Sequence, residues 1–262
     1  MSETDRIPTN LRTLLLLEVL GRSGRAMTAT ELSAKVGLAK QTAHRLCATL
    51  EAESFLIRQG NSKRFLPARR TRTMSTGLLF ASRAHIARHQ VLEDVARQLG
   101  ETVNFAVPEE TGMSYLDRVE TDWPFRVQFP VGSNVPFHCT ASGKTFMSSL
   151  KPKARRAFVL GLNLSRHTSF THTEPEPLLE DLARIAKRGY ALDEEEFIEG
   201  MVAFAVPVRD PDGRFAAALA YHGPRPRMSL DLAIERRPIL TDGARRLSDV
   251  LFSDAPDLPS PA

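Results

Sequence analysis

The sequence predicts an α+β protein with an N-terminal winged helix-turn-helix at residues 1–70, a linker helix at 71–100 and an α/β domain at 101–252. The first observation behind this prediction is a helical spacing of apolar residues up to about residue 53, which then gives way to alternation. The second is that alternation returns after Glu101, followed by further helical segments. The third is that the first third of the chain carries an excess of Lys and Arg, whereas the rest carries an excess of Asp and Glu. The last residues, 253–262, include three prolines and are expected to form a flexible tail.

Composition places the chain among ordinary globular proteins. Of its 262 residues, 42% are hydrophobic and 25% are charged, so wholesale disorder is not expected. The two cysteines, Cys47 and Cys139, are too few for a disulfide framework, which makes a reducing cytoplasm the expected compartment. No stretch approaches the roughly 20 apolar residues of a membrane helix, and the start MSETDRIPTN lacks the basic segment of a signal peptide. No membrane partner is therefore expected.

Positive charge is concentrated in the first third of the chain. Residues 1–92 hold 15 Lys and Arg against 6 Asp and Glu, whereas residues 93–262 hold 20 against 25. Between residues 54 and 92 there is no acidic residue at all. A basic module joined to an acidic remainder favours a unit that binds a polyanion beside a second domain with another partner. A solvated basic face without a partner is the alternative.

The first two helices are predicted from apolar spacing and from a capping signal. Residues 10–22 form a helix whose apolar positions are Leu11, Leu14, Leu15, Leu17 and Val19. Thr28 followed by Glu31 is the pattern of a capping box, which predicts that a second helix begins there. That helix ends at Gly37, because glycine adopts the positive φ of a tight turn at little cost.

The third helix, from about residue 39 to 53, has two separate faces. Its core face has Ala43, Leu46, Cys47 and Leu50 at helical spacing. The other face carries Gln, His, Arg and Thr side chains, which reach base edges in a DNA major groove, and the small Ala48 permits close approach. An ordinary solvated helix face is the alternative.

A basic hairpin is predicted after this helix. Residues 55–58 and 63–66 alternate around Gln59–Ser62, and a hairpin after three helices is the wing of a winged helix. Its cations would contact phosphates independently of sequence. The predicted DNA-contacting residues of helix and wing together are Thr28, Lys40, Gln41, Thr42, His44, Arg45, Thr49, Arg58, Lys63 and Arg64.

Residues 70–100 are predicted to form one long helix, with a break at Gly77 left open. Its solvent face would carry Arg83, His85, Arg88 and His89. Its buried face would carry Leu78, Leu79, Ile86, Val91, Leu92 and Val95, and could pack on the same helix of a second copy. Helix-turn-helix proteins usually pair in this way, because one recognition helix reads only a few base pairs.

The remaining elements alternate between strand and helix. Strands are expected at 102–107, 113–119 and 126–129. A helix follows Cys139–Lys144, from Thr145 to about Leu150, and another covers 177–188. Residues 204–208 and 215–221 form a hairpin around Asp210–Gly213, and the last helix covers about 230–252.

Six spaced segments carry a family resemblance: Gly37–Leu50, Leu99–Asn104, Tyr115–Val119, His138–Lys144, Gly189–Phe197 and Gly200–Pro224. In this order they resemble the IclR family of transcriptional regulators over nearly the whole chain. The resemblance implies a winged helix that binds operator DNA, a GAF-like effector-binding domain, and dimers that often pair into tetramers. It implies a regulator, most often a repressor, and neither an enzyme nor a protein with a cofactor.

The resemblance also implies where an effector binds. The residues expected there are Asn104, Arg126, Gln128, His138, Thr140, Ala141, Ser142, Asp193, Ala203, Ala205, Ala220 and His222. Family members that place Cys or Ser on the last hairpin differ from this chain, which has Ala203, Ala220 and His222. Independently, a helix that starts near Ala141 presents unpaired N–H groups, which suit a carboxylate, and Arg126 or His222 could add positive charge. We therefore expect a small organic anion as effector.

Three other interpretations of these residues compete with this one. Gly143-Lys144-Thr145 resembles the end of a phosphate-binding loop, but the position that needs a second glycine is His138. His138-Cys139 with Asp193 could form the nucleophilic group of an acyl-transfer enzyme. A metal-responsive regulator could use the side chains of His138, Cys139, His167, His172 and His222, although none has the paired spacing of a structural zinc site.

Overall fold

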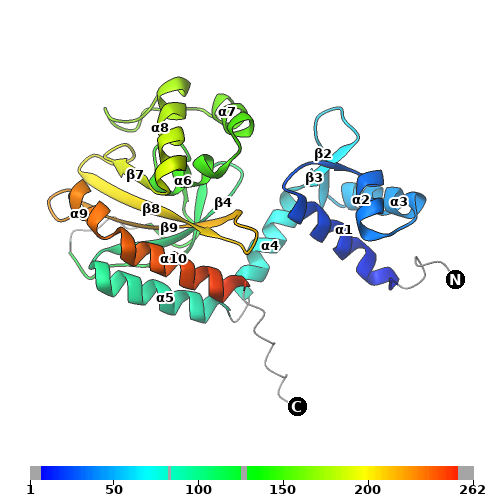
Figure 1. Cartoon of the computed structure of the whole chain (residues 1–262), viewed down its shortest axis with the longest axis horizontal. Helices are drawn as coiled ribbons and strands as arrows, with labels where there is room; N and C mark the ends of the chain where they lie inside the picture. The colour runs from blue at the N-terminus through cyan, green and yellow to red at the C-terminus, as the bar shows by residue number, and fades with distance from the viewer. Residues whose placement is uncertain (1–6, 82–83, 125–128, 253–262) are drawn as a thin grey trace, which may run out of the picture. The chain divides into compact units, whose positions relative to one another are not determined.

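The computed structural model describes residues 7–81, 84–124 and 129–252, and the chain separates into two compact units, residues 1–82 and 83–262 (Figure 1). Each unit is described by itself. No helix within the described residues is long and apolar enough to span a membrane.

The first unit is a small helical bundle with a three-stranded sheet. Its elements are α1 (Thr9–Ser23), β1 (Met27–Thr28), α2 (Ala29–Val36), α3 (Lys40–Ala52), β2 (Leu56–Arg58), β3 (Arg64–Pro67) and α4 (Arg69–Ala81). The sheet has the antiparallel order β1-β3-β2. Leu16, Leu32, Cys47 and Phe65 lie in its core. This is the predicted winged helix-turn-helix, with the two-residue β1 as an addition.

The buried face of α1 differs from the prediction. Leu16 and Leu20 are buried, whereas Leu11 and Leu14 are 44% and 55% exposed. A run of four leucines at 14–17 offers an apolar side chain to every direction around the helix, so the sequence did not determine which face the rest of the unit covers.

The segment predicted as one linker helix is shared between the two units. α4 belongs to the first unit, and α5 (Ala84–Leu99) belongs to the second. α4 runs through Gly77 to Ala81. Val91, Leu92 and Val95 pack in the core of their own chain. They are therefore not available to a second copy.

Arg88 was predicted to face solvent, and this prediction is wrong. Its side chain is fully buried, and its Nε donates to Asp117 Oδ2 at 2.9 Å, while His89 contacts Asp117 Oδ1 at 2.9 Å. The guanidinium also lies over the Phe105 ring. A partner 29 residues away makes this burial possible, and helical periodicity contains no information about it.

The second unit is a six-stranded antiparallel sheet with helices on both faces. Its strands are β4 (Thr102–Pro108), β5 (Met113–Val119), β6 (Asn134–Val135), β7 (Ala191–Glu194), β8 (Met201–Arg209) and β9 (Phe215–Pro224), in the order β6-β5-β4-β9-β8-β7. Its helices after α5 are α6 (Ala141–Ser149), α7 (Pro152–Leu160), α8 (Pro175–Arg188), α9 (Leu230–Glu235) and α10 (Arg237–Phe252). α5 and α10 cover one face, and α6, α7 and α8 lie on the other (Figure 1).

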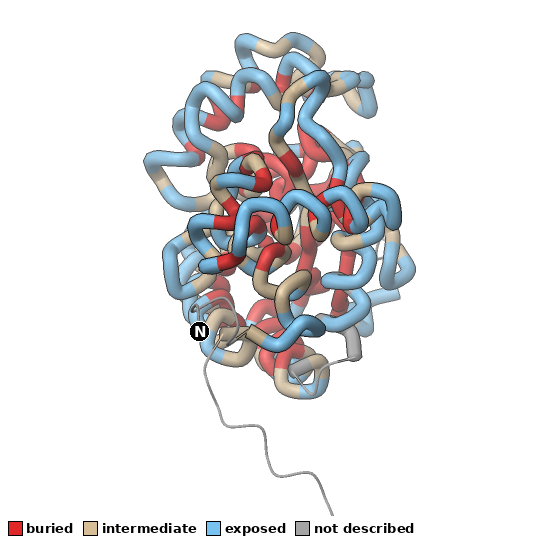
Figure 2. Tube along the Cα trace, turned by 90° about the vertical axis from the view of Figure 1, so that its right-hand side faces the viewer, coloured by how far each residue is buried: buried red, intermediate tan, exposed pale blue. Residues whose placement is uncertain are grey.

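Two apolar cores follow from this layering. One lies between the sheet and α5 with α10, and the other lies between the sheet and α6 with α8. Buried stretches of the chain lie mostly on the inside of the trace and exposed stretches mostly on its outside (Figure 2).

Four details of the second unit differ from the expected elements. The third strand is β6, and of the expected strand at 126–129 residues 126–128 lie outside the described part of the chain. α7 and β7 were not predicted, since each is short and buries its apolar side chains against distant parts of the chain, α7 against α6 and α8, and β7 against α6 and β8. α6 starts at Ala141, four residues before the expected start. The last helix is divided at Arg236 into α9 and α10.

Gly143 lets the first turn of α6 lie against the chain that precedes it. A Cβ at this position would come within 2.3 Å of the carbonyl oxygen of Phe137, which is backbone and cannot swing aside. We expect Gly143→Ala to lower the free energy of unfolding by about 1–3 kcal/mol, as overpacking does. Urea unfolding of the full chain measures the change.

Gly161→Ala is the matched control, because a Cβ there would meet its nearest atom at an ordinary 3.5 Å. Equal stability of the two variants would contradict the close approach at Gly143.

Candidate functional site

The third helix presents the two faces that the sequence predicted. Ala43, Cys47 and Leu50 are buried. Gly37 adopts a left-handed conformation with φ 78° and turns the chain between α2 and α3. The exposed residues of the opposite face are Lys40, Gln41, His44, Arg45, Ala48 and Thr49, with Thr42 half-buried beside them. Lys40 and Arg45 form no ion pair within the described residues.

The wing cations are not equivalent. Arg58 makes two hydrogen bonds to the Glu51 carboxylate, at 2.8 and 3.0 Å, and lies over the Phe65 ring. Arg64 donates to Glu31 at 3.0 Å and to the Ala26 carbonyl at 3.0 Å. Lys63 is exposed and has no such partner in the part of the chain that the structure describes. Two of the three predicted phosphate contacts are therefore already paired with carboxylates.

Thr28, which was also predicted to contact DNA, has a structural task. Its hydroxyl accepts the Glu31 N–H at 3.2 Å, and Glu31 accepts the Thr28 N–H at 2.7 Å, which completes the capping box of α2. The Thr28 N–H and the nearby Arg25 lower the pKa of Glu31 to about 2.

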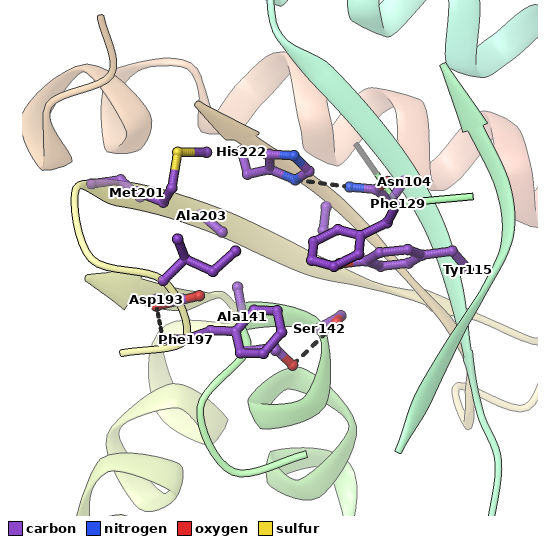
Figure 3. A pocket seen from close by; sticks show the side chains of 14 residues that line it. Asn104, Tyr115, Phe129, Ala141, Ser142, Asp193, Phe197, Met201, Ala203 and His222 are labelled. Carbon is purple, nitrogen blue, oxygen red and sulfur yellow. Dashed lines mark hydrogen bonds between the residues drawn. The ribbon is translucent and has the colours of Figure 1, made fainter. Parts of the chain in front are cut away.

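A cavity of about 40 Å³ opens between the sheet and the N-terminus of α6 (Figure 3). Residues from the sheet, from the start of α6 and from the loop between β7 and β8 surround it. They are Asn104, Tyr115, Phe129, Thr140, Ala141, Ser142, Asp193, Phe197, Ile198, Met201, Val202, Ala203, Ala220 and His222. The 40 Å³ counts only the positions open to the centre of a water molecule; all the empty space between these side chains, including the open mouth, is about 460 Å³, which suits a small organic molecule.

Most of the expected effector residues come together at this cavity, but not all. His138 lies beside it, where its Nε2 is 2.9 Å from the Ser165 carbonyl oxygen. Ala205 is fully buried against Ala141 and Ala220. Arg126 and Gln128 lie outside the described residues. The lining contains no Lys or Arg among the described residues.

The apolar side of the cavity was not predicted from the sequence. Tyr115, Phe129, Phe197, Ile198, Met201 and Val202 line it without having been predicted. The Phe129 ring lies 6.0 Å from that of Phe197 and 6.2 Å from that of Tyr115. The strand alternation that places Asn104 on this face could have identified Tyr115, which projects from the neighbouring strand.

The first turn of α6 faces the cavity with unused N–H groups. Thr140 caps the helix by accepting the Gly143 N–H at 3.1 Å, so the capping alternative is confirmed for Thr140. The first helical bond runs from Lys144 N to Thr140 O, which leaves the N–H groups of Ala141 and Ser142 without a helical acceptor. They supply a weak positive potential.

Asp193 is the acidic group of the cavity. One of its oxygens accepts the N–H groups of Glu196 and Phe197, at 2.8 and 3.3 Å. Burial, reinforced by the charge of Glu196, raises the pKa of Asp193 to about 7. This carboxyl group is therefore close to half-protonated at neutral pH.

His222 is neutral, contrary to the expectation that it adds charge. Burial, and then the charge of Arg118, lower its pKa to about 3. Its Nδ1 lies 3.1 Å from the Asn104 side-chain nitrogen, whose amide oxygen accepts from Arg118 at 2.9 Å. This arrangement makes Nδ1 the acceptor and leaves the proton on Nε2, which has no hydrogen-bond partner among the described residues.

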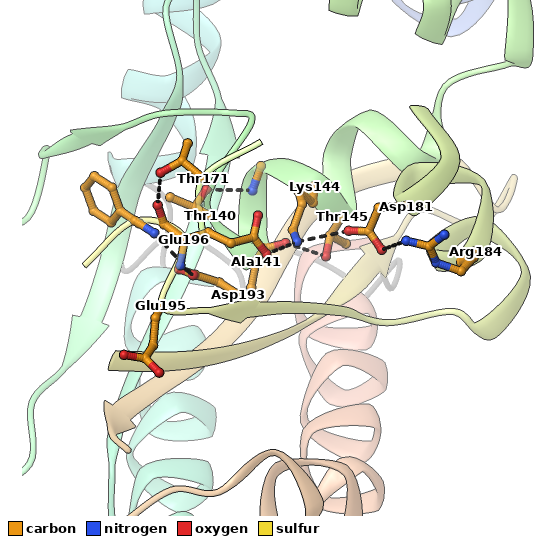
Figure 4. A network of polar contacts seen from close by, with 12 residues as sticks. Thr140, Ala141, Lys144, Thr145, Thr171, Asp181, Arg184, Asp193, Glu195 and Glu196 are labelled. Carbon is orange, nitrogen blue, oxygen red and sulfur yellow. Dashed lines mark hydrogen bonds and ion pairs between the residues drawn. The ribbon is translucent and has the colours of Figure 1, made fainter. Parts of the chain in front are cut away.

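Behind the cavity, a buried lysine joins three elements (Figure 4). Lys144 is 2% exposed, pairs with Asp181 of α8 at 3.0 Å, and pairs with Glu196 of the loop after β7. Arg184 contacts the other oxygen of Asp181 at 3.2 Å. The ammonium group of Lys144 is thus paired with two carboxylates inside the protein and does not face a phosphate, as the lysine of a phosphate-binding loop would.

Cys139 is not placed as a nucleophile. Its side chain is fully buried, and burial, together with Asp193 and Glu196, raises the pKa of the thiol far above its usual range. A thiol that stays protonated does not attack an ester. The geometry therefore opposes the acyl-transfer interpretation.

Both parts of the chain match models of one family. Residues 11–60 match the IclR helix-turn-helix domain, and residues 80–249 match the C-terminal domain of bacterial IclR transcriptional regulators. The probable transcriptional regulator SauR of Cupriavidus necator is 34% identical over 221 residues, which cover 84% of this chain and 88% of that protein. The transcriptional repressor IclR of Escherichia coli is 27% identical over 247 residues, 94% of this chain and 90% of the repressor.

A solved structure resembles the second unit. It is a double mutant of the inducer-binding domain of the transcription factor PobR from Acinetobacter, in complex with 3-hydroxybenzoic acid. It is 26% identical with a TM-score of 0.58, and covers 64% of this chain and 98% of that one. With the family models and the full-length relatives, the conclusion is that this chain belongs to the IclR family of DNA-binding transcriptional regulators.

Proposed function

We propose that this regulator is a cytoplasmic repressor that binds a near-palindromic operator as a homodimer or a dimer of dimers, and that a small carboxylic acid in the α6 cavity controls this binding. The observation that carries the proposal is the cavity itself. It combines unused N–H groups at a helix start with an aromatic wall and a buried carboxyl group.

The DNA-binding part of the proposal rests on α3. Its exposed face combines Gln41, His44 and Arg45, which can read base edges, with Lys40, which can contact the DNA phosphate backbone. Because Arg45 has no ion pair within the part of the chain that the structure describes, it needs to break none there before it binds a guanine. On the wing we assign the main phosphate contact to Lys63, since Glu51 and Glu31 already neutralise Arg58 and Arg64.

The effector part rests on dipoles rather than on a cation. The N–H groups of Ala141 and Ser142 and the Ser142 hydroxyl can donate to a carboxylate, and Phe129 and Phe197 can contact a ring. The related PobR domain was crystallised with 3-hydroxybenzoic acid, which has both features. The effector can change operator binding only if it binds one arrangement of the winged helices better than another.

The protonation state of Asp193 determines whether an anion can bind beside it. Two negative carboxylates in one buried space repel each other, whereas a protonated Asp193 donates a hydrogen bond to the effector carboxylate. The proposed complex therefore contains protonated Asp193. A thermal-shift screen of small carboxylic acids, with 3-hydroxybenzoic acid among them, identifies the ligand, because a ligand of the native state raises the melting temperature.

We expect Arg45→Ala to weaken binding to the duplex upstream of the protein's own gene by roughly 1–3 kcal/mol, and to relax preference at one base position. Fluorescence anisotropy with that duplex and with a random duplex measures both effects. Equal losses on the two duplexes would contradict a base-reading role for Arg45.

We expect Lys63→Ala to weaken binding to both duplexes alike and to reduce the slope of log affinity against log salt by about one. Arg58→Ala is the matched control and should change the slope less, because Glu51 already pairs with Arg58. A larger effect at Arg58 than at Lys63 would reverse our assignment of the wing contacts.

We expect the affinity for the carboxylic acid found in the screen to decrease above about pH 7, toward about tenfold per pH unit, because the complex requires the protonated form of Asp193 and its pKa in the free protein is about 7. Asp193→Asn, which keeps a donor without a charge, should abolish this dependence and retain tight binding at pH 8. Titration calorimetry at pH 6, 7 and 8 measures the affinities.

Ser142→Ala serves as the comparison. It should weaken binding at every pH but leave the pH dependence in place. A wild-type affinity that does not change between pH 6 and 8 would exclude a hydrogen bond from protonated Asp193 to the effector carboxylate.

A further inference from the structure

A sulfur atom and two imidazole rings from separate segments meet beside the start of α6. One ligand atom from each of His138, Cys139 and His167 lies within 4.8 Å of the other two. His138 and Cys139 immediately precede the Thr140 cap, and His167 comes from the loop between α7 and α8. None of the three lines the effector cavity. The proposed function therefore gives them no task.

These side chains are the ligands that thiophilic metal ions prefer. Zinc sites combine cysteine thiolates with neutral imidazoles, whereas oxygen-only sites select calcium or magnesium. A tetrahedral zinc site brings its ligand atoms within about 4 Å of one another, so the observed separations require only a small adjustment. Three protein ligands with one open position are a common zinc arrangement.

The hydrogen bond of His138 leaves one ring nitrogen with a lone pair for a metal. Its Nε2 lies 2.9 Å from the Ser165 carbonyl oxygen, which can only accept, so Nε2 carries the proton and Nδ1 keeps its lone pair. Metal-binding histidines usually donate their second ring N–H to a carbonyl or carboxylate in this way.

The surrounding charges favour a cation. Cys139 is acted on by Glu196 and by the ionised form of Asp193, and Lys144 offsets their negative charge only in part. This negative potential opposes a bare thiolate but attracts a dication. On binding, a metal–sulfur bond replaces the S–H bond, and the proton leaves to solvent.

Access is available from one side. Cys139 is fully buried and His138 nearly so, whereas His167 is exposed at the surface. We propose that His138, Cys139 and His167 form a binding site for one thiophilic divalent cation such as Zn²⁺, with water in the fourth position on the His167 side. The bound ion would join the loop between α7 and α8 to the start of α6.

The site would also contact the effector cavity. The His167 ring packs edge-on against Phe197, with centroids 5.4 Å apart, and Phe197 lines the cavity. A metal that orders His167 therefore restrains one wall of the cavity.

A second group of possible ligands is a poorer candidate. One ligand atom from each of His172, Asp181 and Glu196 lies within 4.8 Å of the other two, but both carboxylates already bind the buried Lys144. A cation there would have to displace the lysine. This contrast favours the cysteine-containing group.

Cobalt titration of the untagged full-length protein, stripped with chelator and kept reduced, tests the proposal. We expect one Co²⁺ per chain, with a near-ultraviolet thiolate-to-cobalt band and the intense visible absorption of a tetrahedral site, both removed by added Zn²⁺. Cys139→Ser should abolish the thiolate band. The matched control is Cys47→Ser, which changes the other buried cysteine, in the first unit, and should keep the band.

His167→Ala keeps the test decisive if Cys139→Ser fails to fold, because His167 is exposed. We expect it to weaken Co²⁺ binding more than about tenfold, since even outer partners of metal ligands contribute that much. Absence of a thiolate band in the wild type, its persistence in Cys139→Ser, or unchanged affinity in His167→Ala would each overturn the site. The measurement involves neither operator nor effector, so its outcome is independent of the proposed function.

Discussion

The second unit depends on a positive charge enclosed at the start of α6. Lys144 has almost no contact with water, so its ammonium group loses its hydration and must recover that free energy from Asp181 and Glu196. Removal of either carboxylate would leave a charge partly uncompensated in a medium of low dielectric constant. The ion pairs therefore restrict where α8 and the loop after β7 can lie relative to α6.

The ion pairs of Lys144 also determine the shape of the cavity, because they fix the loop that closes it. Glu196, held by Lys144, supplies the N–H group that orients Asp193, and Phe197 follows it in the chain. Thr168 and Thr171 hold the carbonyl oxygens of Glu195 and Glu196 from the other side. The loop that closes the cavity is thus fixed from two directions, while the lining itself carries no counter-charge for the acid it contains among the described residues.

Local patterns in the sequence predicted those features whose cause is local. The two faces of α3, the capping box of Thr28 and Glu31, and the left-handed Gly37 each depend on residues within a few positions of one another. The family resemblance added the polar positions of the cavity. Interactions between distant segments were not predictable in this way. The burial of Arg88 depends on Asp117, and the neutral state of His222 depends on its enclosure and on Arg118. The aromatic rings of Phe129 and Phe197 come from segments that are far apart in the sequence, so the periodicity of either segment could not show that they meet.

The pairing of Arg64 with Glu31 has a consequence for association with DNA. Glu31 closes the first turn of α2 and at the same time holds Arg64 at the start of β3, so helix and hairpin are joined before any duplex is present. A DNA-binding domain that is preorganised in this way loses little conformational entropy when it binds, so more of the contact energy remains as affinity. In the proposed complex with DNA, the same rigidity would limit adjustment to altered spacing between phosphates, so tolerance of variant sites would come from the long side chains of α3 rather than from its backbone.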